Sequence, residues 1–154
     1  MSQKAEKFRS RFLQQSLGQY LSTMGIYEKL LNTLSEEEVG NLVEENVFFS
    51  QTCSPSAIMK LTNVPACDIM RLVTIEMTYM RLFLPEEVMG IILHEIGHAF
   101  NPDKQKMDGE FAADNFAKAK GYSKWIVSGL KKGLERKLVG FEKETIDQRI
   151  KNLE

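Results

Sequence analysis

The stretch PEEVMGIILHEIGHAFN, residues 85–101, carries both histidines of this 154-residue chain. A proline at its first position and two glutamates directly after it are typical of a helix start. The Asn-Pro pair at 101–102 is typical of a helix end. Apolar residues recur at helical spacing between these two signals. The stretch therefore predicts one helix that carries His94, Glu95 and His98.

His94 and His98 are spaced to share one metal ion. At about 100° per residue they lie roughly 40° apart and one turn along the same helix face. Their imidazole rings can then converge on a zinc ion, whereas Glu95 is turned by about 100° and lies beside the ligands. There Glu95 can take a proton from a water on the ion, which is what metal-assisted hydrolysis requires. The alternative is a chance match in which the histidines are core or surface residues.

A catalytic zinc site needs a third protein ligand and one position left open for water. No histidine remains in the chain, so the third ligand must be a carboxylate or a cysteine. The extended motif of the astacins and matrix proteases would require a glycine at position 101 and a histidine or aspartate at 104. Asn101 and Lys104 stand there instead, which excludes that class. Asp103 and Asp108 remain candidates from the loop.

The segment EFAAD, residues 110–114, contains a better third ligand. Glu110 and Asp114 lie one turn apart on one helix face, and the small Ala113 allows close approach to the histidine helix. We expect Glu110 to bind zinc, and Asp114 to accept the outer N–H of a ligand histidine and fix its tautomer. Gly97 also indicates a close neighbour, which is either this helix or the strand before the histidine helix, and the alternative is close packing without a functional role. The alternative is a solvated acidic pair at a helix start, where acids are favoured.

The segment before the histidine helix has the pattern of a strand. In LVTIEMTYMRLFL, residues 72–84, β-branched and aromatic residues alternate with a period of two. Three more helices are expected after the histidine helix, at about 110–120, 123–138 and 142–153. The fold is therefore expected to be α+β and mostly helical, with a small sheet.

Residues 1–50 are expected to be helical, because apolar residues recur there at helical spacing. Ser35 and Glu38 fit a capping box that opens a helix reaching Val47. Turn-forming residues at 51–56 mark the expected boundary, so that residues 51–154 form the domain with the histidine helix. The N-terminal region is expected to pack on that domain. The alternative is an arm that binds a partner or regulates the site.

These motifs resemble those of the gluzincin metallopeptidases. The resemblance is strongest to the group of the CAAX prenyl proteases and heat-shock proteases, with its small soluble phage and bacterial relatives. It covers residues 73–153 and rests on HEIGH at 94–98, on EFAAD at 110–114 and on TIDQRIKNL at 145–153. It implies a zincin-like metallopeptidase domain. In that domain the zinc ligands are matched by His94, His98 and Glu110, the general base by Glu95, and the acid behind the ligands by Asp114.

The resemblance also implies a role for the segment that precedes the histidine helix. Residues 73–84 match the edge strand of a small sheet, along which such enzymes lay an extended peptide substrate. The family places a further histidine before its terminal helix to stabilise the transition state, and this chain has none there. Arg149 or Tyr122 can take that role instead.

The composition of the chain limits the binding partners and the cellular compartment that can be expected. The net charge of −1 gives no basic surplus for nucleic acid, and no apolar run approaches the roughly 18–20 residues that span a bilayer. The N-terminus has charges but lacks the apolar core of a secretory signal. We therefore expect a cytoplasmic protein, virion-associated if a phage encodes it, with Cys53 and Cys67 as reduced thiols. The alternative for either thiol is a removable fourth zinc ligand.

The function expected from these features is zinc-dependent hydrolysis of peptide bonds in a peptide or protein substrate. The alternative is a non-enzymatic binding or structural protein on a zincin-like scaffold, such as a component of a phage particle. Glu95 favours the enzyme, because a purely structural zinc site needs no base and usually has four protein ligands.

Overall fold

The structure is a computed structural model that describes residues 2–52, 57–65, 67–138 and 140–154. The chain forms two compact units, Met1–Thr78 and Tyr79–Glu154. The predicted fold class is confirmed, because the described chain is mostly helical and contains one small mixed sheet. No described helix combines the length and the apolar character needed to cross a membrane. The division lies after Thr78, whereas the turn-forming residues at 51–56 predicted a boundary there.

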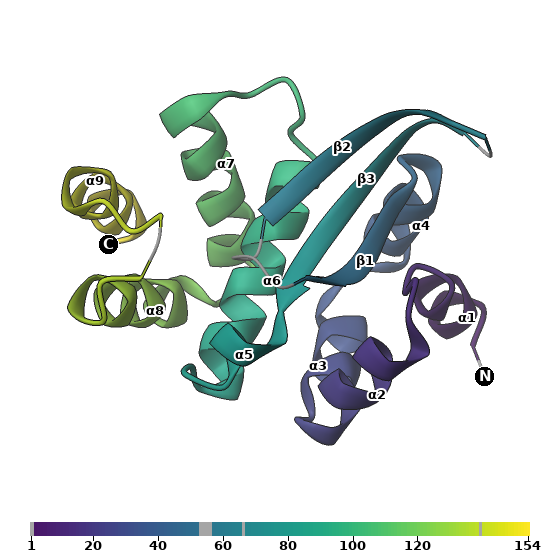
Figure 1. Ribbon diagram of the computed structural model, residues 1–154, viewed down its shortest axis with the longest axis horizontal. Coiled ribbons are helices and arrows are strands. Elements are labelled where there is room, and N and C mark those ends of the chain that lie inside the picture. Colours follow the sequence, from purple (N-terminus) through teal and green to yellow (C-terminus); the bar gives the residue numbers. More distant parts are fainter. Residues whose placement is uncertain (1, 53–56, 66, 139) are drawn as a thin grey trace. The chain divides into compact units, whose positions relative to one another are not determined.

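The first unit contains four helices and a three-stranded sheet (Figure 1). Its elements are α1 (Gln3–Arg9), α2 (Gln15–Thr23), α3 (Ile26–Thr33), α4 (Glu36–Glu44), β1 (Val47–Thr52), β2 (Ala57–Val64) and β3 (Cys67–Glu76). In the sheet β3 lies in the centre, parallel to β1 on one side and antiparallel to β2 on the other. Cys67, at the start of β3, is a half-buried free cysteine, and Cys53 lies outside the described residues.

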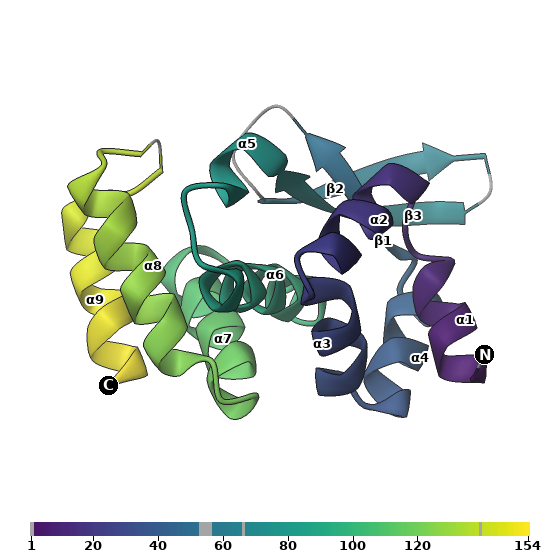
Figure 2. The ribbon, with the colours of Figure 1, turned by 90° about the horizontal axis from the view of Figure 1, so that it is seen from below.

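One face of this sheet carries the core of the first unit. Alternate residues of β1 and β3 are buried there, namely Val47, Phe49, Val73 and Ile75. The rings of Phe8 and Phe12 pack on Phe49, with centroids 5.9 and 4.9 Å away. Figure 2 shows α1, α3 and α4 gathered on one side of the sheet. The apolar stripes of the N-terminal helices therefore serve packing within this unit.

The strand before the histidine helix is shorter than predicted, and it is not an edge strand. β3 ends at Glu76, whereas the prediction extended to residue 84, and residues 77–80 form a short helix, α5 (Met77–Met80). The carboxylate of Glu76 accepts the N–H of Thr78 at 3.0 Å, which favours the helical turn at this point. Because β1 and β2 occupy both sides of β3, a substrate cannot join it as an additional strand.

The helix that opens at Ser35 is also shorter than predicted. The capping box of Ser35 and Glu38 is present, which confirms the helix start. The helix ends at Glu44, and Asn46 then adopts a left-handed φ of 51° that breaks the helical path. Val47 therefore begins β1 instead of continuing the helix, as its β-branched side chain and two following phenylalanines favour.

The second unit is a group of four longer helices that holds all residues of the candidate site. They are α6 (Pro85–Ala99), α7 (Lys106–Ala119), α8 (Ser123–Glu135) and α9 (Lys143–Leu153). These agree with the predicted helices to within about four residues, as expected for boundaries read from a sequence. α6 packs against α7 and α8, and α9 lies beside both α7 and α8 (Figure 2). The side chains of Leu93, Ile96 and Ala117 are fully buried among these helices.

Candidate metal centre

The histidine helix and the helix of Glu110 are in close contact because of one glycine. A Cβ atom on Gly97 would lie 2.7 Å from Cα and 2.9 Å from the carbonyl oxygen of Ala113 on α7. Backbone cannot yield to a contact that short, so only glycine permits this separation of α6 and α7. Of the two neighbours expected for Gly97, the third-ligand helix and the strand before the histidine helix, the structure shows the former. This contact places Glu110 opposite the two histidines.

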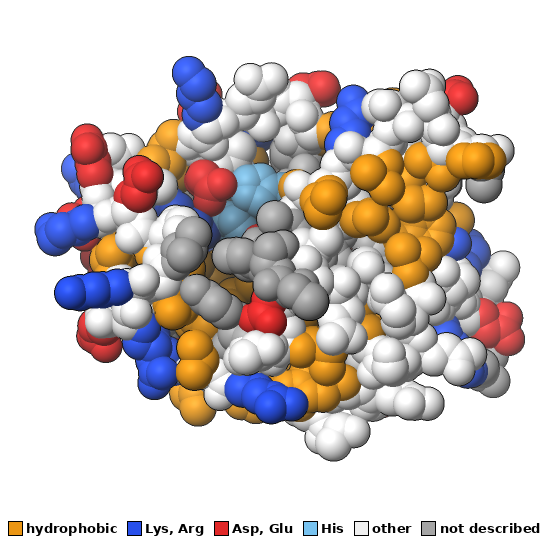
Figure 3. Space-filling view, viewed as in Figure 1, with side chains coloured by type: hydrophobic (Ala, Val, Ile, Leu, Met, Phe, Trp, Pro, Cys, Tyr) orange, Lys and Arg blue, Asp and Glu red, His pale blue; other side chains and the backbone are white. Residues whose placement is uncertain are grey.

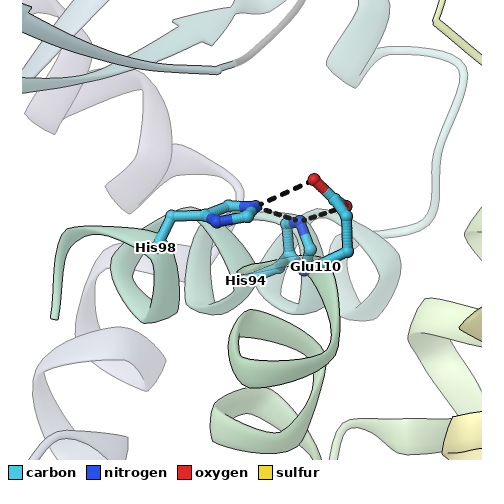
Figure 4. Close-up of side chains that lie close together, drawn as sticks. All are labelled: His94, His98 and Glu110. Carbon is cyan, nitrogen blue, oxygen red and sulfur yellow. Dashed lines mark hydrogen bonds and ion pairs between the residues drawn. The ribbon is translucent and has the colours of Figure 1, made fainter. Parts of the chain in front are cut away.

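Three side chains point at one another across this contact (Figure 4). Nε2 of His94 and Nε2 of His98 lie 3.0 Å apart. The two oxygens of Glu110 complete the cluster, with Oε2 3.4 Å from Nε2 of His94 and Oε1 3.3 Å from Nε2 of His98. Two ligand atoms bound at roughly 2.0–2.1 Å to one tetrahedral zinc ion lie about 3.3 Å apart. The spacing and the chemistry of these three donors therefore fit zinc.

The cluster is open to solvent on one side. The side chain of His94 is 8% exposed, that of His98 19% and that of Glu110 30%. Figure 3 shows histidine side chains reaching the surface beside an acidic side chain. A site with three protein ligands and an accessible side leaves room for a water or a substrate oxygen, which is typical of catalytic zinc sites.

Asp114 and Arg149 lie behind the ligands. Oδ1 of Asp114, which is fully buried, lies 2.8 Å from Nδ1 of His94. Arg149 of α9 donates twice to Asp114, from Nε to Oδ2 at 2.9 Å and from Nη2 to Oδ1 at 2.7 Å. Its Nη1 lies 2.9 Å from Oε2 of Glu110. One guanidinium thus joins both acidic side chains of α7 to α9.

The charges of the cluster favour a cation between the ligands. Burial and the charge of Arg149 lower the pKa of His94, but hydrogen bonds to Asp114 and Glu110 outweigh them and raise it to about 9. Burial would raise the pKa of Glu110 and that of Asp114, yet their bonds to histidine and to Arg149 hold both below the ordinary range. At neutral pH two ionised carboxylates therefore flank a protonated His94, and a divalent cation can replace that proton.

Glu95 differs from the other acidic residues of the site. Its side chain is nearly buried, and it makes no hydrogen bond or ion pair with any described residue. Burial raises the pKa of its carboxyl group, although the two histidines oppose this. It follows His94 directly on α6 and so lies beside the cluster. A buried carboxylate without a fixed partner is available to accept a proton.

The structure brings five predicted site residues into one hydrogen-bonded and ion-paired group, namely His94, His98, Glu110, Asp114 and Arg149. Tyr122 is not among them, because no hydrogen bond or ion pair joins it to the group. It lies beyond the end of α7, roughly two and a half turns of helix from Glu110. Asp103 and Asp108 are exposed and take no part. Within the described part of the chain, no cysteine belongs to the ligand cluster.

The contacts of Arg149 could not be predicted from the sequence. The resemblance pointed to this residue as a stabiliser of the transition state, whereas its guanidinium contacts Asp114 and Glu110. Its Nη2 also lies 3.2 Å from Nδ1 of His94. Arg149 is 35 residues from Asp114 in the sequence. No local pattern reports a contact of that separation; only the packing of α9 on α7 creates it.

A scan against protein-family models, a search of curated proteins and a search of solved structures each find no match to this chain.

Proposed function

We propose that this protein is a zinc-dependent peptidase. The observation that carries the proposal is the convergence of His94, His98 and Glu110, whose ligand atoms lie 3.0–3.4 Å apart on two helices. A free carboxylate next to the ligands, at Glu95, adds the group that hydrolysis needs beyond metal binding. The resemblance to the gluzincin metallopeptidases agrees with both features.

Each residue of the group has a separate task in this proposal. His94 and His98 present Nε2, and Glu110 presents a carboxylate oxygen, to the ion. Asp114 accepts the N–H at Nδ1 of His94 at 2.8 Å, which fixes the tautomer that leaves Nε2 free to bind. When bound, zinc would lower the pKa of a water molecule and polarise the carbonyl of the peptide bond.

Glu95 is the proposed general base. Its carboxylate takes the proton from the attacking water and then delivers it to the nitrogen of the leaving amine. Two features of the residue suit this cycle. Burial raises the pKa of the carboxyl group, which strengthens its conjugate base. The carboxylate also has no partner among the described residues that would have to be displaced.

The test measures zinc per chain and the cleavage of a broad peptide library for matched variants. Glu95→Gln retains the shape of the side chain but cannot accept a proton, so zinc should stay at one per chain and cleavage should fall about 10²–10⁴-fold. Glu110→Gln should lose zinc and cleavage together, because it removes an anionic ligand. Asp108→Asn removes an exposed acid two residues from Glu110 and should change neither.

Two results would contradict the proposal. If Glu95→Gln loses zinc while Glu110→Gln retains zinc and activity, the roles are assigned wrongly. If the unaltered protein binds zinc and cleaves nothing in the library, the non-enzymatic scaffold becomes the better account of the site.

A further inference from the structure

All three guanidinium nitrogens of Arg149 contact acidic residues of the site. Its Nε and Nη2 each donate to one oxygen of Asp114, at 2.9 and 2.7 Å, and its Nη1 lies 2.9 Å from Oε2 of Glu110. Its side chain is only 12% exposed. Such a bidentate pair is geometrically strict, because the guanidinium is planar and its donors are fixed relative to one another.

The two carboxylates that Arg149 joins would otherwise repel each other. Glu110 and Asp114 are four residues apart on α7, where like charges destabilise a helix and push the side chains apart. Asp114 is fully buried and has Arg149 and His94 as partners, so its position is fixed. Glu110 is 30% exposed and would have solvent to turn towards without the contact to Arg149.

Arg149 also distinguishes the two oxygens of Glu110. The guanidinium holds Oε2, whereas Oε1 lies 3.3 Å from Nε2 of His98 and has no contact with Arg149. Oε1 is therefore the oxygen of Glu110 that can bind an ion without sharing its contact with the guanidinium. The ligand is presented through one oxygen and in one orientation.

We propose that Arg149 is a positioning residue of the metal site. It holds Glu110 in place as a ligand through one oxygen and fixes Asp114 against His94. This inference rests on the proposed zinc site and adds a residue on the last helix, α9, that determines how well the site binds metal. Arg149 acts through Glu110 and Asp114 and does not itself contact the ion or the substrate.

The charge of Arg149 and its role in orienting the ligands predict opposite changes in zinc affinity when the residue is substituted, so the two effects can be told apart. A cation near the site repels a divalent ion, so loss of its charge alone would tighten zinc binding. Loss of a residue that orients the ligands weakens metal binding, by about 10–100-fold in known sites. Arg149→Met removes the charge and the planar set of guanidinium donors but retains an unbranched apolar side chain. Arg149→Lys retains the charge but cannot donate twice to Asp114 and reach Glu110 at once.

The experiment measures zinc affinity by competition with a chromogenic chelator, and the visible absorption of the cobalt-substituted protein. Both Arg149→Met and Arg149→Lys should bind zinc about 10–100-fold more weakly than the unaltered protein. The cobalt absorption band should change in shape, because Glu110 is no longer restricted to one oxygen. The matched control is Lys151→Met, which removes an exposed cation from the same helix and should alter neither measurement.

Three results would contradict the positioning role of Arg149 or the site on which it rests. Equal or tighter zinc binding in both Arg149 variants, with an unchanged cobalt spectrum, would overturn the inference while the zinc site stands. If Arg149→Met does not fold, Arg149→Lys decides alone, and wild-type affinity in that variant refutes positioning. If the unaltered protein binds no zinc, the proposed function fails first and takes this inference with it.

Discussion

The two halves of α6 use a buried glutamate in opposite ways. Glu87, in the first turn, is 1% exposed and its carboxylate accepts from the N–H of Leu84 at 2.8 Å, from Ser128 at 2.7 Å and from Lys132. Glu95 lies eight residues further on and is 9% exposed, but it has no hydrogen bond or ion pair with a described residue. Burial alone therefore does not identify a reactive carboxylate.

The pKa values of these two groups reflect the same difference. Burial would raise the pKa of Glu87, but hydrogen bonds from Lys132, Ser128 and the Leu84 backbone outweigh it and lower the pKa. Burial raises the pKa of Glu95, and here no hydrogen bond opposes it. The first glutamate joins α6 to α8 as a permanent anion, whereas the second remains able to exchange a proton. A carboxylate that joins two helices and the proposed general base thus lie on the same helix.

The largest expected effect on stability is that of metal removal, which tests the C-terminal half of α6. Zinc that binds only the folded protein should stabilise it by about 2.7 kcal/mol at a free concentration 100 times its dissociation constant. Excess chelator should remove this stabilisation in the unaltered protein and in Glu87→Gln, but should have little effect on Glu110→Gln. The fluorescence of Trp125, the single tryptophan, reports unfolding of the second unit from within α8. Unfolding that is insensitive to the chelator in all three proteins would count against the site.

A smaller effect is expected from Glu87→Gln, which tests the N-terminal half. The variant leaves Lys132 without its anionic partner, and because that lysine is 25% exposed it can turn partly to water. We expect a loss of about 1–2 kcal/mol, less than for a fully buried pair, with zinc per chain unchanged. The matched variant Glu95→Gln should unfold within about 0.5 kcal/mol of the unaltered protein, because it breaks no bond. Equal destabilisation by both substitutions would remove the distinction between the two glutamates.

The stabilisation by Glu87 should depend on pH in a defined direction. The pKa of this group in the folded protein lies below its ordinary value of 4.5, so its contribution is present above that pH and is lost as the pH falls through the lowered value. The difference in unfolding free energy between the unaltered protein and Glu87→Gln should therefore be constant near neutrality and shrink below about pH 4.5. A difference that grows on acidification would contradict the assigned charge state of Glu87.

Local patterns were sufficient to predict which side chains converge at the candidate site. The spacing of His94 and His98, the position of Glu95 beside them and the one-turn spacing of Glu110 and Asp114 all follow from helical periodicity. The small Ala113 then predicted the contact that brings the two helices together, Gly97 indicated a close neighbour without deciding which, and the structure contains that contact. Each of these features depends on residues within a turn or two of one another, or on residue size.

Contacts between distant segments could not be predicted in this way. Glu87 has the usual signature of an acid in a first helical turn, and nothing near it in the sequence indicates Lys132, 45 residues away. The strand β1 was missed for a related reason. Val47 fits a helical stripe as well as a strand, and only pairing with β3 decides between them. The same pairing, with β2 on the other side, placed the predicted edge strand in the centre of the sheet.

The smallest expected effect compares the two glycines of α6. A Cβ on Gly97 would meet the Ala113 backbone at 2.7 Å, whereas a Cβ on Gly90 would meet Cγ1 of Ile126, a side-chain atom, at 3.2 Å. Alanine adds about 1 kcal/mol of helix stability at either position, and overpacking costs about 1–3 kcal/mol where the neighbour cannot move. Gly90→Ala should therefore be neutral or slightly stabilising. Gly97→Ala should lower the unfolding free energy of the metal-free protein, measured in excess chelator, by about 1 kcal/mol.

The two glycine variants should also differ in zinc affinity, because Gly97 sets the distance between the histidines and the helix of Glu110. The added Cβ would increase the distance between α6 and α7 by a few tenths of an ångström and displace Glu110. Gly97→Ala should therefore bind zinc several-fold more weakly. Gly90→Ala changes only the contact with α8 and should bind zinc as the unaltered protein does. The measurements are Trp125 unfolding in excess chelator and zinc affinity by competition. Equal affinity in both variants would show that the α6–α7 separation does not control the metal centre, and the two halves of α6 would then be alike in this respect.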